Sequence, residues 1–293
     1  MPYNKTTSVN GKEIILTREE KSAVDEFHKS RIAFAFLSDG RCAININDAR
    51  EHKVYLKDDF GISFEEFEKM FAEQGIEISQ SQYGMLDKYA HILVEYNKVM
   101  NLTGITDPMG ISEKHFLDSL LIFKYCDIPQ NGRVIDVGTG AGFPGVPMKI
   151  YRHDLDVTLL DSLMKRVKFL EAVAAETLPM TCIHARAEDG GRDKSLRESY
   201  DVAAARAVAA LPVLAEYCLP FVKVGGSFIA MKGPNENISE GNNAVKTLGG
   251  EISNVYEYAL PCGDKRVIVE IKKISATPTK YPRVGAQISK KHL

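Results

Sequence analysis

The stretch DVGTGAGFPG, from Asp136 to Gly145, packs four glycines and one acid into ten residues. It continues an apolar run. At the end of such a run, glycines let a backbone turn approach a bound ligand closely. Read from Gly140, the stretch fits the G-x-G-x-x-G pattern of dinucleotide-binding loops. Read from Gly138, the third glycine position holds Phe143 instead. The pattern alone predicts a ligand-binding turn and leaves the ligand open.

The acid narrows the choice of ligand. Asp136 stands two residues before Gly138, where a carboxylate would repel the pyrophosphate of a dinucleotide. It would favour a cation instead, and S-adenosylmethionine carries a sulfonium and an ammonium group but no phosphate. We therefore expect Asp136, Gly138 and Gly140 to belong to an S-adenosylmethionine site.

A second acid, Asp161, ends the next run of apolar residues. A carboxylate at this position can accept hydrogen bonds from the ribose hydroxyls of either cofactor class. It can also cap the helix that is expected to follow it at SLMKRV. The two interpretations are compatible, and both stay open.

The elements that would position these residues follow an alternating pattern. From Asn131 onward, short runs rich in β-branched and apolar residues predict strands: RVIDV (133–137), DVTLLD (156–161), MTCIHA (180–185), YDVAAA (200–205) and GSFIAMK (226–232). Between the second and third runs, residues 163–178 repeat apolar side chains at helical spacing. Strands that alternate with helices predict βαβ units and a parallel sheet.

Two further strand patterns, VYEYAL (255–260) and KRVIVEIKK (265–273), have no helical pattern between them and predict an antiparallel pair at the sheet edge. The expected fold is therefore α/β and Rossmann-like, with a mostly parallel sheet of seven strands. Residues 63–130 are helical in pattern, with a long helix followed by another that opens at Ser112. We expect this helical layer to precede a catalytic domain at 131–293.

Residues 1–62 are expected to form a small N-terminal extension, for which the pattern indicates no function. Residues 17–30 are helical in pattern. Residues 33–45 carry an Asp-Gly turn between two apolar runs, which predicts a hairpin.

The composition excludes some classes of protein. No apolar run approaches the roughly 20 residues needed to cross a bilayer, and the five cysteines are scattered without metal-ligand spacing. We therefore expect a cytoplasmic protein with reduced thiols, no membrane span and no metal. The formal net charge is −2, but residues 265–293 hold eight Lys or Arg and one acid, Glu270. This basic tract fits either a phosphate-contacting surface or a solubilising tail.

Several motifs stand in the order in which one known family carries them: NLTGIT (101–106), KHFLDSL (114–120), DVGTGAGFPGVPMKI (136–150), TLLDSLMKRVKFL (158–170), HARAED (184–189), YDVAAARAVA (200–209), AMKG (230–233) and KYPR (280–283). In this combination the chain closely resembles the ribosomal RNA small subunit methyltransferase G family, also called glucose-inhibited division protein B. The resemblance spans Phe64 to Leu293, and the N-terminal extension lies outside it.

The resemblance implies an enzyme that moves a methyl group from S-adenosylmethionine to N7 of a guanine in 16S ribosomal RNA. Its partner would be 16S rRNA or the small ribosomal subunit, and we expect it to be a monomer. Matched motif by motif, the family's cofactor contacts fall on Gly138, Phe143, Ala187, Glu188 and Arg206. Aliphatic residues also occur in the family at the place of Phe143, so the phenyl ring is a mild departure.

Guanine N7 has an exposed lone pair, so the transfer needs alignment and exclusion of water rather than a general base or a covalent cysteine. No catalytic residue is assigned, and Arg206, which follows the fourth strand, is the best candidate near the reacting atoms. Cys262 follows a proline, as some methyltransferase nucleophiles do, but is expected to be a small buried thiol. His115 and Asp118, three residues apart on one helix, either pair near the site or fix a helix interface.

RNA contacts are expected from basic side chains, namely Lys114, Lys165, Arg166, Lys280 and Arg283. Lys165 and Arg166 fit a solvated helical turn equally well. Three alternative functions stay open: a small-molecule methyltransferase, an NAD-dependent oxidoreductase, and a non-catalytic ribosome-binding module whose site the extension blocks. The basic tract counts against the first, and Asp136 with the missing third glycine counts against the second.

Overall fold

The computed structural model describes residues 61–206 and 208–293, together with the backbone of five short strands among the first 60 residues. Those strands are β1 (Thr6–Val9), β2 (Lys12–Ile15), β3 (Phe34–Phe36), β4 (Cys42–Asn45) and β5 (His52–Tyr55). β3 pairs antiparallel with β4, so the hairpin predicted over residues 33–45 is confirmed. The helix predicted over residues 17–30 lies outside the described residues.

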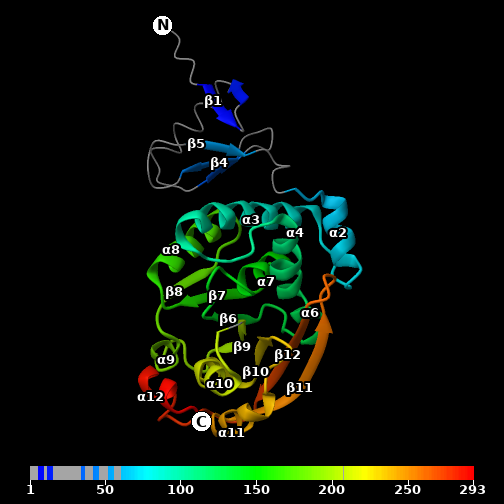
Figure 1. Ribbon diagram of the computed structural model, residues 1–293. Coiled ribbons are helices and arrows are strands. Elements are labelled where there is room, and N and C mark those ends of the chain that lie inside the picture. The colour runs from blue at the N-terminus through cyan, green and yellow to red at the C-terminus, as the bar shows by residue number, and fades with distance from the viewer. Residues whose placement is uncertain are drawn as a thin grey trace.

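A seven-stranded sheet forms the centre of the molecule (Figure 1), in the order β11-β12-β10-β9-β6-β7-β8. Its strands are β6 (Arg133–Val137), β7 (Asp156–Asp161), β8 (Thr181–His184), β9 (Tyr200–Arg206), β10 (Val222–Lys232), β11 (Gly250–Ala259) and β12 (Lys265–Lys273). β6 to β10 pair in parallel, whereas β12 is antiparallel to both β10 and β11. The predicted Rossmann-like sheet with an antiparallel edge is confirmed.

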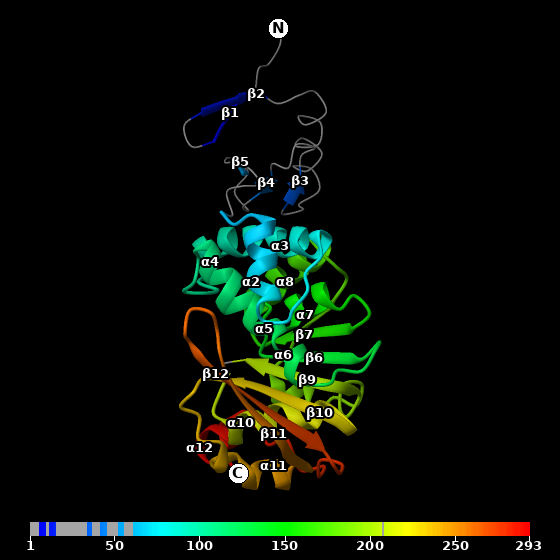
Figure 2. The same ribbon diagram turned by 90° about the vertical axis from the view of Figure 1, so that its right-hand side faces the viewer.

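Both faces of the sheet are buried. Val134 and Ala204 belong to one hydrophobic core, and their neighbours Ile135 and Ala203 belong to the other. Strands with two apolar faces need helices on both sides, and Figure 2 shows them. One face carries α3 (Gln80–Met100), α7 (Gly145–Tyr151) and α8 (Met164–Glu176), and the other carries α9 (Ala187–Gly190), α10 (Leu211–Cys218) and α11 (Asn242–Thr247).

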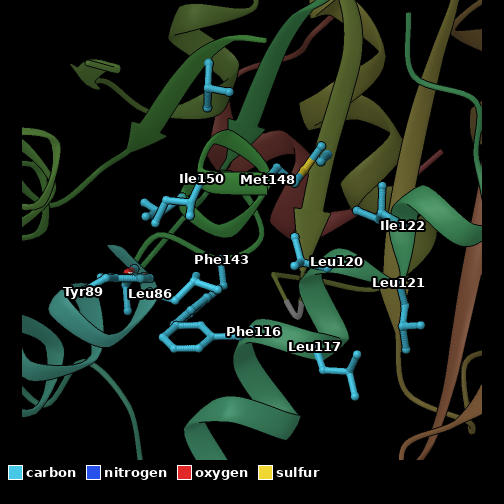
Figure 3. Packing of buried hydrophobic residues seen from close by; sticks show 14 of the residues in the cluster. Leu86, Tyr89, Phe116, Leu117, Leu120, Leu121, Ile122, Phe143, Met148 and Ile150 are labelled. Atoms are coloured by element: carbon cyan, nitrogen blue, oxygen red, sulfur yellow. The ribbon is translucent and has the colours of Figure 1, made fainter. Parts of the chain in front are cut away.

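The helical layer shares its core with the sheet. It comprises α2 (Phe64–Ala72), α3, α4 (Pro108–Gly110), the π-helical segment η2 (Ile111–Leu117), α5 (Asp118–Leu120) and α6 (Ile122–Tyr125). Figure 3 shows Tyr89 of α3 and Phe116 of η2 packed around Phe143 of the glycine-rich turn. The ring centroids of Tyr89 and Phe116 lie 5.4 and 6.2 Å from that of Phe143. The layer therefore packs directly on the predicted ligand turn.

One expectation about a helix is wrong. The helix expected to open at Ser112 begins earlier, at Pro108, because the Asp107 side chain accepts a hydrogen bond from the Gly110 amide at 2.7 Å. Ser112 itself is buried within η2. The pattern also missed α11, whose six residues are too few to show a clear helical period. Short helices η3 (Leu219–Phe221), η4 (Ile238–Gly241) and α12 (Gly285–Lys290) complete the chain.

The sheet topology creates a crevice at the ends of two strands. From β6 the chain builds outward through β7 to β8, and it then crosses back to place β9 on the other side of β6. The loops that follow β6 and β9 therefore leave in opposite directions. In an open α/β sheet this switch point is where ligands bind.

Candidate active site

The turn after β6 is tied to the end of β7. The amides of Gly138 and Thr139 both donate to the carbonyl of Leu160, at 2.8 and 3.1 Å. The Gly140 amide donates to Asp161 Oδ2 at 2.9 Å. Gly138 has φ +70°, and a Cβ there would lie 3.0 Å from the side chain of Val208. A glycine is therefore required at 138 by both the backbone angle and the available space.

Asp136 lies beneath this turn rather than in the crevice. Its side chain is completely buried, and Oδ2 accepts hydrogen bonds from Thr139 Oγ1 at 2.6 Å and from the Gly145 amide at 2.8 Å. Oδ1 has no hydrogen-bond partner among the described residues. Burial raises the pKa of this carboxyl to about 6. Asp136 thus shapes the turn from below.

The close approach of helix and strand comes from Gly145. A Cβ on Gly145 would lie 2.5 Å from the Leu159 side chain and 2.9 Å from Asp136 Oδ2. This glycine lets α7 start directly against β6 and β7, a role that the sequence pattern did not assign to it. Phe143 does not take that place: its ring is buried in the core and stacks on His115, with centroids 4.4 Å apart.

A central pocket of about 390 Å³ opens above the turn. It is lined by the turn, by the end of β7, by the loop after α3, and by residues that flank them: Leu102, Thr103, His115, Gly138, Thr139, Gly140, Ala141, Phe143, Asp161, Ser162, Arg166, Arg206 and Val208. Its volume falls within the range of small-molecule sites.

The N-cap of α8 is Leu163 and no side chain in the described part of the chain caps this helix, so the expectation that Asp161 caps it is wrong; Asp161 instead lines the central pocket. Its carboxylate is almost fully buried and lines the central pocket. Oδ1 accepts a hydrogen bond from the Leu163 amide at 2.9 Å, just before α8 begins. Oδ2 accepts the hydrogen bond from the Gly140 amide and lies 3.4 Å from Arg166 Nη1. Asp161 thus joins the start of α8 to the glycine turn and still faces the pocket.

A smaller pocket of about 130 Å³ adjoins the central one, and we call it the Glu188 pocket. Gly138, Ser162 and Val208 line both pockets. Ala187 and Glu188, the first two residues of α9, line the far side of the Glu188 pocket. These residues follow β8, so three consecutive strand ends, those of β6, β7 and β8, supply one continuous cavity.

On the other side, a pocket of about 330 Å³ contains Arg266, and we call it the Arg266 pocket. It shares His115 and Arg206 with the central pocket. Its remaining lining residues are Ile105, Lys114, Asp118, Met231, Lys232, Gly233 and Arg266. Four of the lining side chains are Lys or Arg, and each lies within 4 Å of a carboxylate: Lys114 of Asp264, Lys232 of Glu236, and Arg206 and Arg266 of Asp118.

Arg206 stands between the central and Arg266 pockets. Its Nη1 donates to the Lys114 carbonyl at 3.0 Å and to Asp118 Oδ2 at 3.2 Å. Its Nη2 lies 3.2 Å from His115 Nδ1, and its guanidinium carbon lies 4.7 Å from the centre of the Phe143 ring. Arg206, at the end of β9, therefore lines both pockets.

His115 and Asp118 do not pair with each other; both bind Arg206. Asp118 also accepts a hydrogen bond from Tyr258 at 2.8 Å and lies 3.7 Å from Arg266 Nε. Burial lowers the pKa of His115 to about 3, with a further lowering by Arg206, so the imidazole is neutral near pH 7. Tyr258 and Arg266 carried no signal in the sequence, because Tyr258 lies 140 residues from Asp118 along the chain.

The expected RNA-contacting residues lie in different settings. Lys114 lines the Arg266 pocket and pairs with Asp264 at 3.0 Å, and Arg166 lines the central pocket. Lys165 and Lys280 are exposed. Arg283 is different, because its guanidinium donates to both carboxylate oxygens of the fully buried Glu216, at 2.9 and 2.7 Å. Arg283 therefore anchors the C-terminal tract to α10, and its charge is already paired.

One expectation about the cysteines is wrong. Cys262 is exposed rather than buried, because it lies at the tip of the β11–β12 hairpin, where its amide donates to Glu113. It lines none of the three pockets. In the part of the chain that the structure describes, no group of His, Cys, Asp and Glu residues could hold a metal ion. Within the same residues, no helix is long and apolar enough to span a membrane.

Comparisons with known proteins fit this arrangement. Residues 82–265 match the GidB family model, described as rRNA small subunit methyltransferase G. The Ribosomal RNA small subunit methyltransferase G of Alkaliphilus oremlandii is 51% identical over 220 residues, which are 73% of this chain and 92% of that protein. Those of Clostridium beijerinckii and Desulforamulus reducens are 48% and 46% identical, over 76% and 75% of this chain and 95% and 93% of their own. The chain therefore belongs to the rRNA small subunit methyltransferase G family.

Proposed function

We propose that this protein transfers a methyl group from S-adenosylmethionine to N7 of a guanine in 16S ribosomal RNA. The observation that carries the proposal is the row of three adjoining pockets at the sheet switch point. In this assignment the adenine lies in the Glu188 pocket, the ribose and methionine lie in the central pocket, and the guanine lies in the Arg266 pocket. Arg206 then stands at the junction where the methyl group must pass.

The hydrogen bonds of the glycine turn favour a cofactor without phosphate. In phosphate-binding loops the backbone amides point at the ligand. Here the amides of Gly138 and Thr139 are used by the Leu160 carbonyl, and that of Gly140 by Asp161. At the start of α7, where an anion would bind, the Gly145 amide is held by the Asp136 carboxylate. The turn is therefore shaped by internal acids, and a pyrophosphate would meet negative charge.

The cofactor contacts follow from this placement. Gly138, Ala187 and Glu188 would contact the adenine, and the Asp161 carboxylate would accept from the ribose hydroxyls. Gly140, Phe143 and Arg206 would border the methionine end. Asp136 would act indirectly, by holding the turn through Thr139 and Gly145. This differs from a direct contact between Asp136 and the cofactor cation.

For this methyl transfer the protein mainly has to align the two reacting groups. S-adenosylmethionine supplies an electrophilic methyl group, and guanine N7 supplies a lone pair without prior deprotonation. Arg206, fixed by Lys114 and Asp118, would orient the guanine or a neighbouring phosphate. Positive charge moves from the cofactor to the base during transfer. His115, whose pKa is near 3, adds no further positive charge beside it.

The RNA would reach the site at the Arg266 pocket, whose arginine and lysine side chains could exchange their carboxylate partners for phosphates. Lys114, Arg166 and the exposed Lys165 and Lys280 would contact its phosphates. The target guanine would be splayed out from a loop or an accessible strand, because a base stacked inside a helix cannot enter a pocket. The substrate would be 16S rRNA itself or the small ribosomal subunit.

We also propose a cytoplasmic monomer with three parts: residues 1–62 as an extension, 63–130 as the helical region, and 131–293 as the catalytic domain. The relatives cover about three quarters of this chain, close to the share that residues 63–293 make up, which supports the first boundary. Light scattering after gel filtration would test the oligomeric state.

The proposal is tested by methylation of rRNA with methyl-labelled S-adenosylmethionine. The purified protein is incubated with 16S rRNA and, separately, with small ribosomal subunits, and labelled nucleotides are mapped. Label at N7 of one guanine is the expected result, and calorimetry should detect S-adenosylmethionine binding but none of NAD. Label at another atom, labelling of small molecules only, or tighter binding of NAD would refute the assignment.

A further inference from the structure

A chain of three side chains links the central pocket to the Arg266 pocket. Thr103 Oγ1 lies 2.8 Å from His115 Nε2, and His115 Nδ1 lies 3.2 Å from Arg206 Nη2. Thr103 lines the central pocket, and Arg206 lines both pockets. We propose that Thr103 is a positioning residue for methyl transfer, which sets the orientation of the Arg206 guanidinium through His115. This inference rests on the proposed function, because Arg206 acts on the reacting groups only if that function holds.

His115 Nδ1 has two neighbours at 3.2 Å, Arg206 Nη2 and the Lys114 carbonyl oxygen. A guanidinium can only donate and a carbonyl can only accept, so the tautomer decides which of the two Nδ1 bonds. The Lys114 carbonyl already accepts from Arg206 Nη1 at 3.0 Å, and we take His115 Nδ1 as the acceptor for Arg206. The neutral imidazole then carries its proton on Nε2, which donates to Thr103 Oγ1. The same hydroxyl oxygen accepts the Ile105 amide at 3.0 Å. Thr103 therefore holds the imidazole at Nε2, in the orientation in which Nδ1 lies against Arg206.

The imidazole ring of His115 can orient Arg206 because a stacking contact also restricts its rotation. It stacks on Phe143 with an interplanar angle of 25°, and its own backbone belongs to the π-helical segment η2. Arg206 also lies over the Phe143 ring. A rotation of His115 would therefore break the contact to Arg206 and the stacking together.

The hydroxyl of Thr103 can be removed without releasing the loop that carries it. Asn97 in α3 holds this loop through three hydrogen bonds. Its Oδ1 accepts the Leu102 amide at 2.6 Å and the Thr103 amide at 2.8 Å, and its Nδ2 donates to the Thr103 carbonyl at 2.9 Å. A substitution confined to the Thr103 side chain should consequently leave the backbone in place.

The test compares Thr103→Val, which keeps the shape and removes the hydroxyl, with Thr103→Ser, which keeps the hydroxyl. We expect Thr103→Val to lower the methylation rate constant about tenfold at saturating RNA and cofactor, the effect of losing one buried hydrogen bond. The melting temperature should fall modestly, because the Ile105 amide also loses its acceptor, and the dissociation constant for S-adenosylmethionine should change far less than the rate. Thr103→Ser should restore most of the rate.

A double-mutant cycle separates positioning from general loss of structure. In an Arg206→Lys background, Thr103→Val should have little additional effect on the rate, because the group that it positions is gone. An undiminished effect in that background, or equal losses in the Val and Ser variants, would overturn the inference.

A second readout does not depend on activity. The ¹⁵N chemical shifts of His115 should show a proton on Nε2 in the parent, and Thr103→Val should change them. If the parent shows Nδ1 protonated, the inference fails even when the protein methylates rRNA. If the parent shows Nε2 protonated but methylates no rRNA, the proposed function fails instead.

Discussion

The cofactor side of the site and the base side are built in opposite ways. The central and Glu188 pockets are made largely from the turns that follow β6, β7 and β8, and much of their shape comes from backbone hydrogen bonds within those turns. The Arg266 pocket is made from side chains of distant segments, held by ion pairs such as Arg206 to Asp118, which are 88 residues apart. Substitutions that change the shape of the turns should therefore weaken cofactor binding in the central and Glu188 pockets. Substitutions that remove a charge should weaken the action of the Arg266 pocket on the RNA.

The largest effect is expected from a change of shape on the cofactor side. Gly138→Val forces a branched side chain onto a backbone with φ +70°, and its Cβ would meet Val208 at 3.0 Å. We expect a loss of S-adenosylmethionine affinity of at least about a hundredfold, since both the turn and the pocket wall must shift. Isothermal titration would measure it, with circular dichroism to check the fold.

Gly84→Val is a matched control for this change. Gly84 lies within α3, and a Cβ there meets nothing within 4 Å. Valine is no worse than glycine in a helix interior. A folded Gly138→Val protein with the cofactor affinity of the Gly84→Val control would contradict the assignment of the turn.

On the base side, the next largest effect should follow a change of charge. Asp118→Asn keeps the size of the side chain but leaves Arg206 and Arg266 without their shared carboxylate. Removing one partner of a buried ion pair is costly, so kcat/KM for rRNA should fall about a hundredfold. The dissociation constant for S-adenosylmethionine should change far less. Single-turnover methylation and titration would measure the two quantities.

Tyr258→Phe provides a graded control, because it removes one hydrogen bond to Asp118 and no charge. Its effect on kcat/KM should be about fivefold, in line with a single neutral donor. If Asp118→Asn weakened cofactor binding as strongly as methylation, the distinction between the two sides of the site would be lost.

The same contrast explains what could be predicted from the sequence. The strands and the ligand turn were predictable because their signals are local: alternating apolar residues, and glycines next to an acid at a strand end. The ion pairs around Asp118 were not predictable, because Tyr258 and Arg266 reach it only after β11 and β12 have paired. The π-helical geometry of η2 was missed for a related reason, since its residues have an ordinary helical pattern.

Asp136 shows a limit of local signals even on the cofactor side. Its position in the sequence was read correctly as part of the turn, but its charge was expected to face the ligand. The structure buries the carboxylate under the turn, bonded to Thr139 and Gly145. The pattern identified which residues belong together, and packing determined which of them line the pocket.

A moderate effect is expected from Asp136→Asn, and it should depend on pH. The native carboxyl has a pKa of about 6, above the usual 3.8, so the folded protein binds this proton more tightly than the unfolded chain does. The parent should therefore lose stability as the pH rises from about 4 to 6, and asparagine should not. The stability of the variant relative to the parent should rise by on the order of 1–3 kcal/mol between pH 4 and pH 7. Urea unfolding at several pH values would measure it.

This substitution also tests how Asp136 serves the cofactor. If Asp136 only shapes the turn, the asparagine oxygen can still accept from Thr139 and Gly145, and S-adenosylmethionine affinity should change little. A large loss of affinity would show that the carboxylate charge attracts the cofactor cation. A stability difference that does not vary with pH would contradict the raised pKa.

The smallest effect is expected from the basic C-terminal tract, where charge acts without building a pocket. Lys280, Lys290 and Lys291 are exposed, whereas Arg283 is paired with Glu216 and should be left intact. Replacing the three lysines by Gln should raise the KM for rRNA a fewfold and flatten its salt dependence, because each lost phosphate contact removes somewhat less than one released counterion. The rate constant at saturating rRNA and the cofactor affinity should not change.

The matched control replaces Lys69, Lys194 and Lys246 by Gln, three exposed lysines that line none of the three pockets. Both variants lose the same formal charge, so a difference between their salt slopes reports the place of the charge rather than its amount. Equal slopes would mean that the tract acts only as a solubilising surface. The RNA contacts would then have to come from Lys114, Lys165 and Arg166. In that case, neutralising these three residues should flatten the salt dependence of the KM for rRNA.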